Sequence, residues 1–154
     1  MKITINQAFA AHAYLAELNL TSFSNTIRIA IFKNVGELTA AIESVQKKME
    51  ESRKKMFKGL ETEVQEVAKL RDEFNKEETT DERKSEIIKD IERHEAYLQT
   101  EKEYMEVVKS YGKDKVELNL VPIKLTQFID GLIESGIKFN ALNLQQISFL
   151  LEGE

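Results

Sequence analysis

The stretch TIRIAIFKNVGEL, residues 26–38, contains the point at which the spacing of apolar residues changes. Before Asn34, the isoleucines at 27, 29 and 31 alternate with Arg28 and Ala30, a period of two that is typical of a half-buried strand. After Asn34 the spacing becomes three and four, which is typical of a helix with one apolar side. The sequence therefore predicts a strand over 26–32 and a helix that begins after Asn34 as its N-cap.

The helix that follows carries a heptad pattern, the mark of a coiled coil. Its apolar positions alternate in steps of three and four, with one polar interruption, at Val35, Leu38, Ile42, Val45, Met49 and Met56. Near Gly59 two steps of four come together, a stutter that predicts a local irregularity. Because the chain has only one proline, nothing else interrupts this pattern, and we predict a helix over 35–75.

A second long helix is predicted after the polar break NKEETTDE, residues 75–82. Thr79 followed by Glu82 forms a capping box, and Gly112 is a typical C-terminal stop. The helix is predicted over 80–111. Because the connection between the two long helices is short, they must run antiparallel, as a two-helix coiled-coil hairpin.

Residues 115–121 return to a period of two, which Pro122 ends, and we predict that they pair with 26–32 as an antiparallel ribbon. Short terminal helices are predicted over 4–18, where Thr4 and Gln7 form a capping box, over 125–135, and after Asn143. The predicted fold is mainly α, of the α+β kind. It is a single domain, 1–154, with a stalk over 34–112 inserted in a head formed by 1–33 and 113–154.

Composition narrows the class of protein. The chain has no cysteine, which excludes disulfides and thiolate chemistry. Its net charge of −5 argues against non-specific binding to nucleic acid or to an anionic membrane. The first twenty residues lack the apolar core of a signal peptide, and no stretch approaches the roughly 18 apolar residues of a membrane span. We therefore expect a cytoplasmic protein without a membrane partner.

The sequence offers little catalytic chemistry. It contains no nucleotide-binding, zinc-protease or nucleophile-elbow motif, and its many carboxylates lie on strongly charged helices where water solvates them. Asp90 and His94 share a helix face, but two ligands are too few for a metal, so His94 is better interpreted as a residue that sets coiled-coil register. His12 lies among alanines as a filler. We predict a non-enzymatic protein without cofactor or metal.

Tyrosines recur every seven residues on the second long helix. They could cover the partner helix of the same chain with their hydroxyls in water, or form a second packing surface for another copy. We favour the second interpretation, which makes the protein a homo-oligomer, a dimer or higher. The predicted interface consists of Tyr97, Leu98, Tyr104, Met105 and Tyr111.

One basic cluster stands out in QKKMEESRKKMFKG, residues 46–59. It could contact phosphates, but Glu50 and Glu51 lie inside it, so a solvated helix face is the favoured interpretation. A nucleic-acid binder acting through 47–58 is kept as an alternative function. The cluster comprises Lys47, Lys48, Arg53, Lys54, Lys55 and Lys58.

Three segments together resemble a family of small uncharacterised proteins of tailed phages and prophages. They follow an opening helix, and they are the isoleucine-rich predicted strand with Lys33 and Asn34 leading into the long charged helix, VELNLVPI at 116–123, and LNLQQISFLLE at 142–152. The resemblance implies a phage or prophage gene and a structural or accessory role. It supplies no catalytic residues.

The function predicted from the sequence is that of an oligomeric coiled-coil interaction protein, structural or accessory and not enzymatic. A second alternative, besides the nucleic-acid binder, is a chaperone of the prefoldin type or an assembly chaperone. That role requires exposed apolar residues at the tip of the hairpin, here near Leu70, Phe74 and Ile87.

Overall fold

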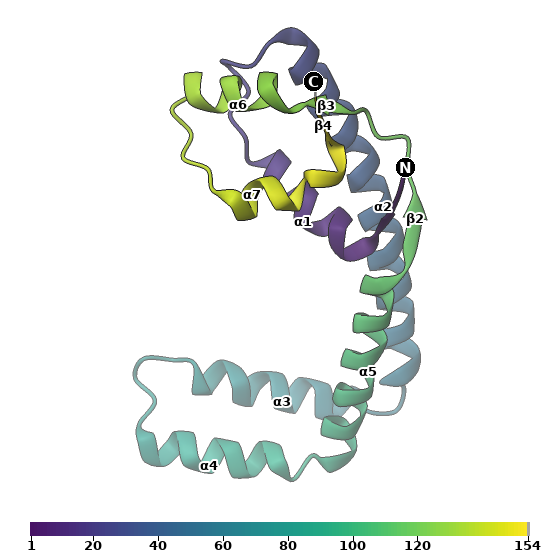
Figure 1. Cartoon of the computed structure of the whole chain (residues 1–154). Helices are drawn as coiled ribbons and strands as arrows, with labels where there is room; N and C mark the ends of the chain where they lie inside the picture. Colours follow the sequence, from purple (N-terminus) through teal and green to yellow (C-terminus); the bar gives the residue numbers. More distant parts are fainter. Residues whose placement is uncertain (154) are drawn as a thin grey trace. The chain divides into compact units, whose positions relative to one another are not determined.

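The structure is a computed structural model that describes residues 1–153, a mainly α-helical chain with seven α-helices and two small two-stranded sheets in that range (Figure 1). The chain divides into two compact units. The first unit combines residues 1–46 with those from 111 onwards, and the second unit is residues 47–110. The predicted stalk of 34–112 is longer than the second unit, because Leu38 and Ala41 pack into the core of the first.

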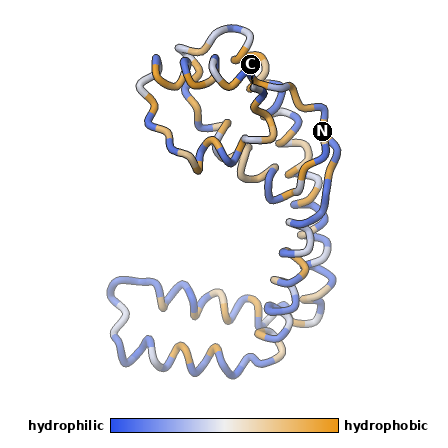
Figure 2. Tube along the Cα trace, viewed as in Figure 1, coloured by the Kyte–Doolittle hydropathy of each residue, from blue (hydrophilic) through white to orange (hydrophobic). Residues whose placement is uncertain are grey.

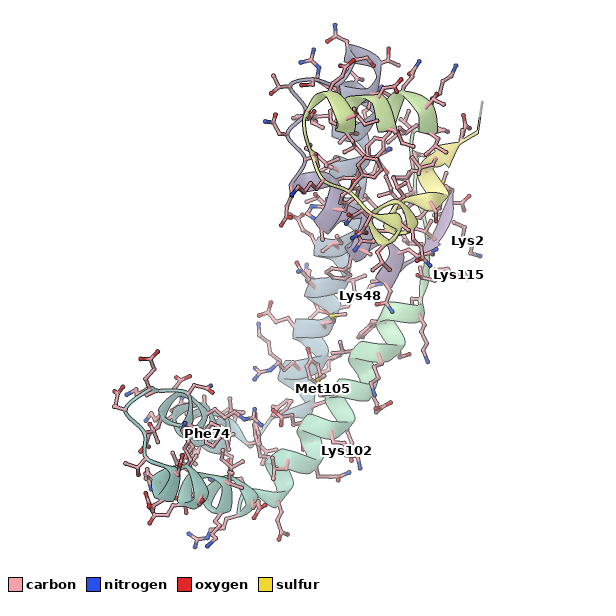
Figure 3. All side chains as sticks on the ribbon, turned by 60° about the vertical axis from the view of Figure 1, so that its left-hand side comes forward. Lys2, Lys48, Phe74, Lys102, Met105 and Lys115 are labelled. Carbon is pink, nitrogen blue, oxygen red and sulfur yellow. The ribbon has the colours of Figure 1, made fainter. Side chains whose placement is uncertain are left out.

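The first unit opens with a strand that the sequence analysis did not predict. Strand β1, Lys2–Thr4, pairs antiparallel with β2, Lys115–Glu117, so that Ile3 lies opposite Val116. Lys2 and Lys115 project from this ribbon, whereas Ile3 is buried (Figure 3). A small antiparallel ribbon is present, but the predicted pairing of 26–32 with 115–121 is wrong. Its first strand is β1, and β2 covers only the start of the predicted 115–121.

Helix α1, Ile5–Ala16, begins where the sequence predicted. The hydroxyl of Thr4 accepts a hydrogen bond from the Gln7 amide at 3.2 Å, and the Gln7 side chain accepts one from the Thr4 amide at 2.8 Å. This capping box satisfies two backbone donors that the first turn of a helix leaves free. The prediction of a capped helix here is confirmed.

The strand predicted over 26–32 is wrong, because these residues belong to helix α2, Asn25–Met56. The carbonyl of Ser24 accepts from the Arg28 amide at 2.9 Å, and its hydroxyl accepts from the Ile27 amide at 3.4 Å, so Ser24 caps the helix. Ile27, Ile31, Asn34 and Leu38 are all buried at steps of four and three. The helical period thus begins before Asn34, and Asn34 is no N-cap.

Two further helices and a second sheet complete the first unit. Strand β3, Ile123–Lys124, was not predicted, whereas α6, Leu125–Glu134, which follows it directly, matches the helix predicted over 125–135. Helix α7, Ala141–Gln146, is capped by Asn140 rather than by Asn143, whose side chain instead accepts from the Asn140 amide at 3.1 Å. A 3-10 turn, Ser148–Leu150, and β4, Leu151–Glu152, follow, and β4 pairs parallel with β3.

The core of the first unit lies between α1, α2, α6 and the C-terminal segment. The ring of Phe128 packs against Phe23, with ring centroids 5.6 Å apart, and against Tyr14 at 6.5 Å. Figure 2 shows apolar residues recurring along all of these elements. The fully buried members include Leu15, Ile27, Ile31, Leu38, Ile123, Phe128, Leu132, Ile147 and Leu150.

The second unit shows that both predicted long helices are interrupted. The first ends at Met56 and resumes as α3, Glu61–Phe74, with Gly59 at φ 87° in the connection, where the stutter predicted an irregularity. The second is divided into α4, Asp81–Glu92, and α5, Glu95–Lys113. Two capping predictions are also wrong. Thr80, not Thr79, caps α4, and Gly112 lies inside α5.

Gly112 is required by packing and not by a helix end. A Cβ atom on Gly112 would lie 2.3 Å from the Asn6 side chain, so the glycine lets α5 approach α1 closely.

In the second unit, α3 and α4 lie side by side (Figure 1), and the end of α2 lies beside α5. Phe57 contacts Tyr97 while Met49 contacts Tyr104, so the second pair is antiparallel. The chain doubles back as predicted, but in two short helix pairs.

Candidate interaction surface

The most unusual surface of the first unit is the outer side of α2. Phe32 is 79% exposed and Ile29, one turn earlier, is 57% exposed. Gly36 follows one turn after Phe32 and adds no side chain of its own. We call Ile29, Phe32 and Gly36 the α2 face. Single exposed apolar residues are common on proteins, but an aromatic ring and an isoleucine adjacent on one helix face indicate an interaction surface.

Two hollows lie on either side of the α2 face, and each is lined in part by residues of that face. An apolar hollow of about 380 Å³ lies beside Phe32, and a more polar one of about 580 Å³ lies beside Ile29. The apolar hollow is lined by Leu15, Leu18, Leu20, Phe32, Val35 and Gly36. The polar hollow includes Ile29, Lys33, Pro122, Lys124 and Glu152 in its lining.

The charge on the outer side of α2 changes sign along the helix. Arg28 and Lys33 are exposed near its start, whereas Glu43 is exposed and Glu37 half-buried further on. The Arg28 guanidinium donates to the Asn25 side chain, and the Glu37 carboxylate accepts from the Asn119 amide at 3.4 Å. Cationic residues therefore lie beside Ile29 and Phe32, and anionic residues follow Gly36 along the helix.

The tyrosines of the predicted interface face their own chain. Tyr97 is only 5% exposed and packs on Phe57, with ring centroids 5.6 Å apart. Tyr104 is half-buried against the same ring at 6.0 Å, and its hydroxyl donates to the Met49 carbonyl at 3.3 Å. Both residues cover the partner helix within one chain, which corrects their assignment to an intermolecular surface.

The remaining members of the predicted interface divide between the units. Leu98 packs against the same cluster as Tyr97, and Tyr111 is half-buried in the first unit. Met105, on α5 (Figure 3), is 51% exposed. Of the five predicted residues only Met105 presents an exposed apolar side chain, so the set does not form one apolar surface.

An ion pair fastens α3 to α5 above Tyr97. Both terminal nitrogens of Arg71 donate to the Glu101 carboxylate at 2.7 Å, and the guanidinium lies 5.8 Å from the centroid of the Tyr97 ring. The Tyr97 hydroxyl donates to the same carboxylate at 2.9 Å. These hydrogen bonds, Arg71 first, hold the pKa of Glu101 below its ordinary value, whereas burial raises the pKa of Tyr97.

The lowered pKa of Glu101 predicts a pH dependence of stability. The unfolded chain takes up this proton near the ordinary pKa of 4.5, before the folded chain does, so unfolding is favoured as the pH falls. We expect the melting temperature of the second unit to decrease as the pH is lowered below about 5. In Glu101→Gln that fall should be smaller, although Glu73, whose pKa Arg83 also lowers, retains its share. Identical pH profiles would contradict the role of this pair.

The basic cluster lies at the end of α2 and just after it, where its members are exposed. Lys54 pairs with Glu50 at 2.8 Å, and the Arg53 guanidinium lies 5.1 Å from the Phe57 ring centroid. These two cations therefore already have partners within the chain. Glu50 and Glu51 are exposed within the cluster and oppose its positive charge.

Each histidine contacts a residue of its own chain. Asp90 accepts from Arg93 at 3.0 Å, whereas His94 lies 3.7 Å from Glu66. The imidazole of His12 shares a hydrogen bond of 3.0 Å with Thr39. Within residues 1–153 no three potential ligands come together in a way that could hold a metal ion.

The tip that the chaperone alternative requires is packed. Ile87 is fully buried, and Phe74 is half-buried with the Lys84 ammonium 5.6 Å from its ring centroid (Figure 3). Leu70 is also half-buried. Ile88 on α4 is exposed, but the residues that the chaperone interpretation named do not form an open apolar surface.

Comparison of the chain with protein-family models, with curated proteins and with solved structures gives no match. No helix in the described part of the chain is both long and apolar enough to cross a membrane. The α2 face is therefore identified by its own geometry. Ile29 and Phe32 fall in the strand predicted over 26–32, and that prediction did not place them on the outer side of a helix.

Proposed function

We propose that this chain is a non-enzymatic, oligomeric interaction protein with a structural or accessory role, and that its copies meet through the α2 face. The observation that carries the proposal is the exposure of Phe32 and Ile29 on one side of α2, beside an apolar hollow. The second unit contributes helix pairs of a coiled-coil-like kind. The resemblance of the sequence to phage and prophage proteins supports a structural or accessory role, encoded by a phage or prophage gene.

The energetics favour association through this surface. Burying a phenylalanine or isoleucine side chain stabilises the buried state by roughly 1.5–3 kcal/mol. A contact between two copies buries Phe32 and Ile29 of both copies, so each contributes two side chains. This gain is partly offset by the translational and rotational entropy that the two molecules lose when they associate. Self-association through an uncharged aromatic centre is therefore physically reasonable, whereas leaving Phe32 in water has no structural benefit within one chain.

The two alternatives receive less support. A chaperone needs an apolar surface at the hairpin tip, which is packed around Ile87. Nucleic-acid binding through 47–58 predicts an affinity that decreases steeply with salt. The acidic residues within that segment oppose such binding, so we do not adopt it.

Replacing Phe32 with aspartate tests the proposal. Light scattering should give the wild-type chain a mass that is a multiple of 17.7 kDa and Phe32→Asp a mass near that of one chain. The reason is that an aspartate at the centre of the contact would lose its hydration on association. Ile88→Asp is the matched control, because Ile88 is an exposed apolar residue of the second unit, and it should not alter the mass. A wild-type mass of 17.7 kDa would overturn the proposal.

A further inference from the structure

We infer that two copies form a closed dimer in which their α2 helices cross antiparallel, with Phe32 of each copy resting on Gly36 of the other. This inference rests on the proposed function and specifies its partner, a second copy, and its geometry. It is carried by three properties of α2. They are a projecting ring beside a bare glycine, a reversal of charge along the helix, and an apolar hollow on one flank.

The ring and the glycine are complementary in shape. A Cβ atom placed on Gly36 would meet nothing within 4 Å, so the glycine leaves open space beside α2 that the protein itself does not fill. Phe32 lies four residues before it, one helical turn away. An antiparallel crossing centred near residue 34 places each Phe32 opposite the other copy's Gly36. A parallel crossing in register would instead place ring against ring and glycine against glycine.

The charges select the same direction. In an antiparallel crossing, the segment with Arg28 and Lys33 lies beside the segment of the other copy that carries Glu37 and Glu43. In a parallel crossing, like charges would lie side by side, which opposes association. Because α2 carries both signs in order, it is complementary to its own reversed copy.

The hollow beside Phe32 provides the remaining apolar area. It lies on one flank of α2, and a two-fold axis perpendicular to both helices brings the hollows of the two copies to the same flank. The two rings then lie between walls formed by Leu18, Leu20 and Val35 of both copies. A two-fold contact uses the same surface on both partners, so it closes at two copies and does not propagate.

Thiol cross-linking tests the direction of crossing, since the chain has no cysteine of its own. At 1.5 Å per residue, a crossing centred on residue 34 separates the two copies of position 33 by about 3 Å along the helix axis, and those of position 25 by about 27 Å. A short bifunctional thiol reagent should therefore yield covalent dimers of Lys33→Cys and not of Asn25→Cys. Equal cross-linking of both variants, or of Asn25→Cys alone, would overturn the antiparallel arrangement.

Gly36→Leu supplies a second test that separates folding from association. A leucine in the interior of a helix is favourable relative to glycine, and the site is open, so the melting temperature of the monomer, measured in the Phe32→Asp background, should not fall. The leucine would fill the space beside residue 36 that Phe32 of the other copy occupies in the dimer. The dissociation constant of the dimer of the otherwise wild-type chain should therefore rise roughly tenfold or more. Unchanged dimerisation in Gly36→Leu would overturn the contact between Phe32 and Gly36.

The outcomes distinguish this inference from the proposed function. A wild-type chain with the mass of one copy, 17.7 kDa, would overturn both. A dimer that Phe32→Asp dissociates, but that cross-links through Asn25→Cys, would retain the proposed function and overturn only the geometry. A mass of three or more copies would overturn the closed dimer alone.

Discussion

Replacing Asn34 with leucine is expected to lower the free energy of unfolding by about 2–6 kcal/mol. The Asn34 amide is fully buried and bonds both backbone groups of Val121. Its Nδ2 donates to the Val121 carbonyl at 2.8 Å, and its Oδ1 accepts from the Val121 amide at 2.6 Å. Leucine has a similar size but no polar atom, so it would leave a backbone donor and acceptor without partners at about 1–3 kcal/mol each.

Urea unfolding of Asn34→Leu measures this loss, and amide exchange locates it. Exchange at the Val121 amide should accelerate, because its bond to Asn34 protects it in the folded chain. Ser44→Leu is the control, an exposed serine on the same helix, and should change stability by less than about 0.5 kcal/mol. If Asn34→Leu unfolds at the same urea concentration as the wild type, the side-chain amide of Asn34 does not stabilise the segment that contains Val121.

Asn34 also explains why the start of α2 was mistaken for a strand. Buried residues at 27, 31, 34 and 38 follow the helical period, but one of them is an asparagine, so the apolar pattern seemed to begin only afterwards. Ile29 on the outer side, between the buried Ile27 and Ile31, then produced an apparent alternation. Ile29, which misled the prediction, belongs to the proposed interaction surface, and proposed functional sites are where departures from the usual apolar pattern are expected.

Local signals predicted the elements that depend on local chemistry. The capping box at Thr4, the span of α6 and the irregularity at Gly59 each follow from a few neighbouring residues. The break between α4 and α5 at 93–94 has no glycine or proline to signal it. The pairing of β1 with β2, and of Asn34 with Val121, joins residues distant in sequence, which periodicity does not report.

The tyrosine stripe illustrates the same limit for the candidate site. A spacing of seven places Tyr97 and Tyr104 on one side of α5 but does not say which helix covers that side. The interruption after Met56 turns Phe57 toward both rings, so they are buried within the chain. The width of an apolar stripe alone therefore did not distinguish an intermolecular surface from an internal one.

Replacing Tyr97 with alanine is expected to destabilise the second unit by about 3–5 kcal/mol, the usual cost of removing a buried aromatic ring. The ring packs on Phe57 and lies beneath the Arg71 guanidinium, so its loss leaves a cavity where α2, α3 and α5 meet. Amide exchange should accelerate across residues 47–110. The mass measured in solution should remain that of the wild type, because Tyr97 faces its own chain.

Tyr97→Phe separates the ring from its hydroxyl. It retains the contact with Phe57 and removes the hydrogen bond to Glu101, so it should cost only about 0.5–1.5 kcal/mol. Arg71 and Glu101 remain paired in this variant, which keeps the join between α3 and α5. If Tyr97→Ala instead lowers the mass measured in solution while amide exchange across 47–110 stays at the wild-type rate, Tyr97 belongs to an intermolecular contact. The internal packing described for it would then be wrong, because a buried core residue cannot be removed without loosening the helices around it.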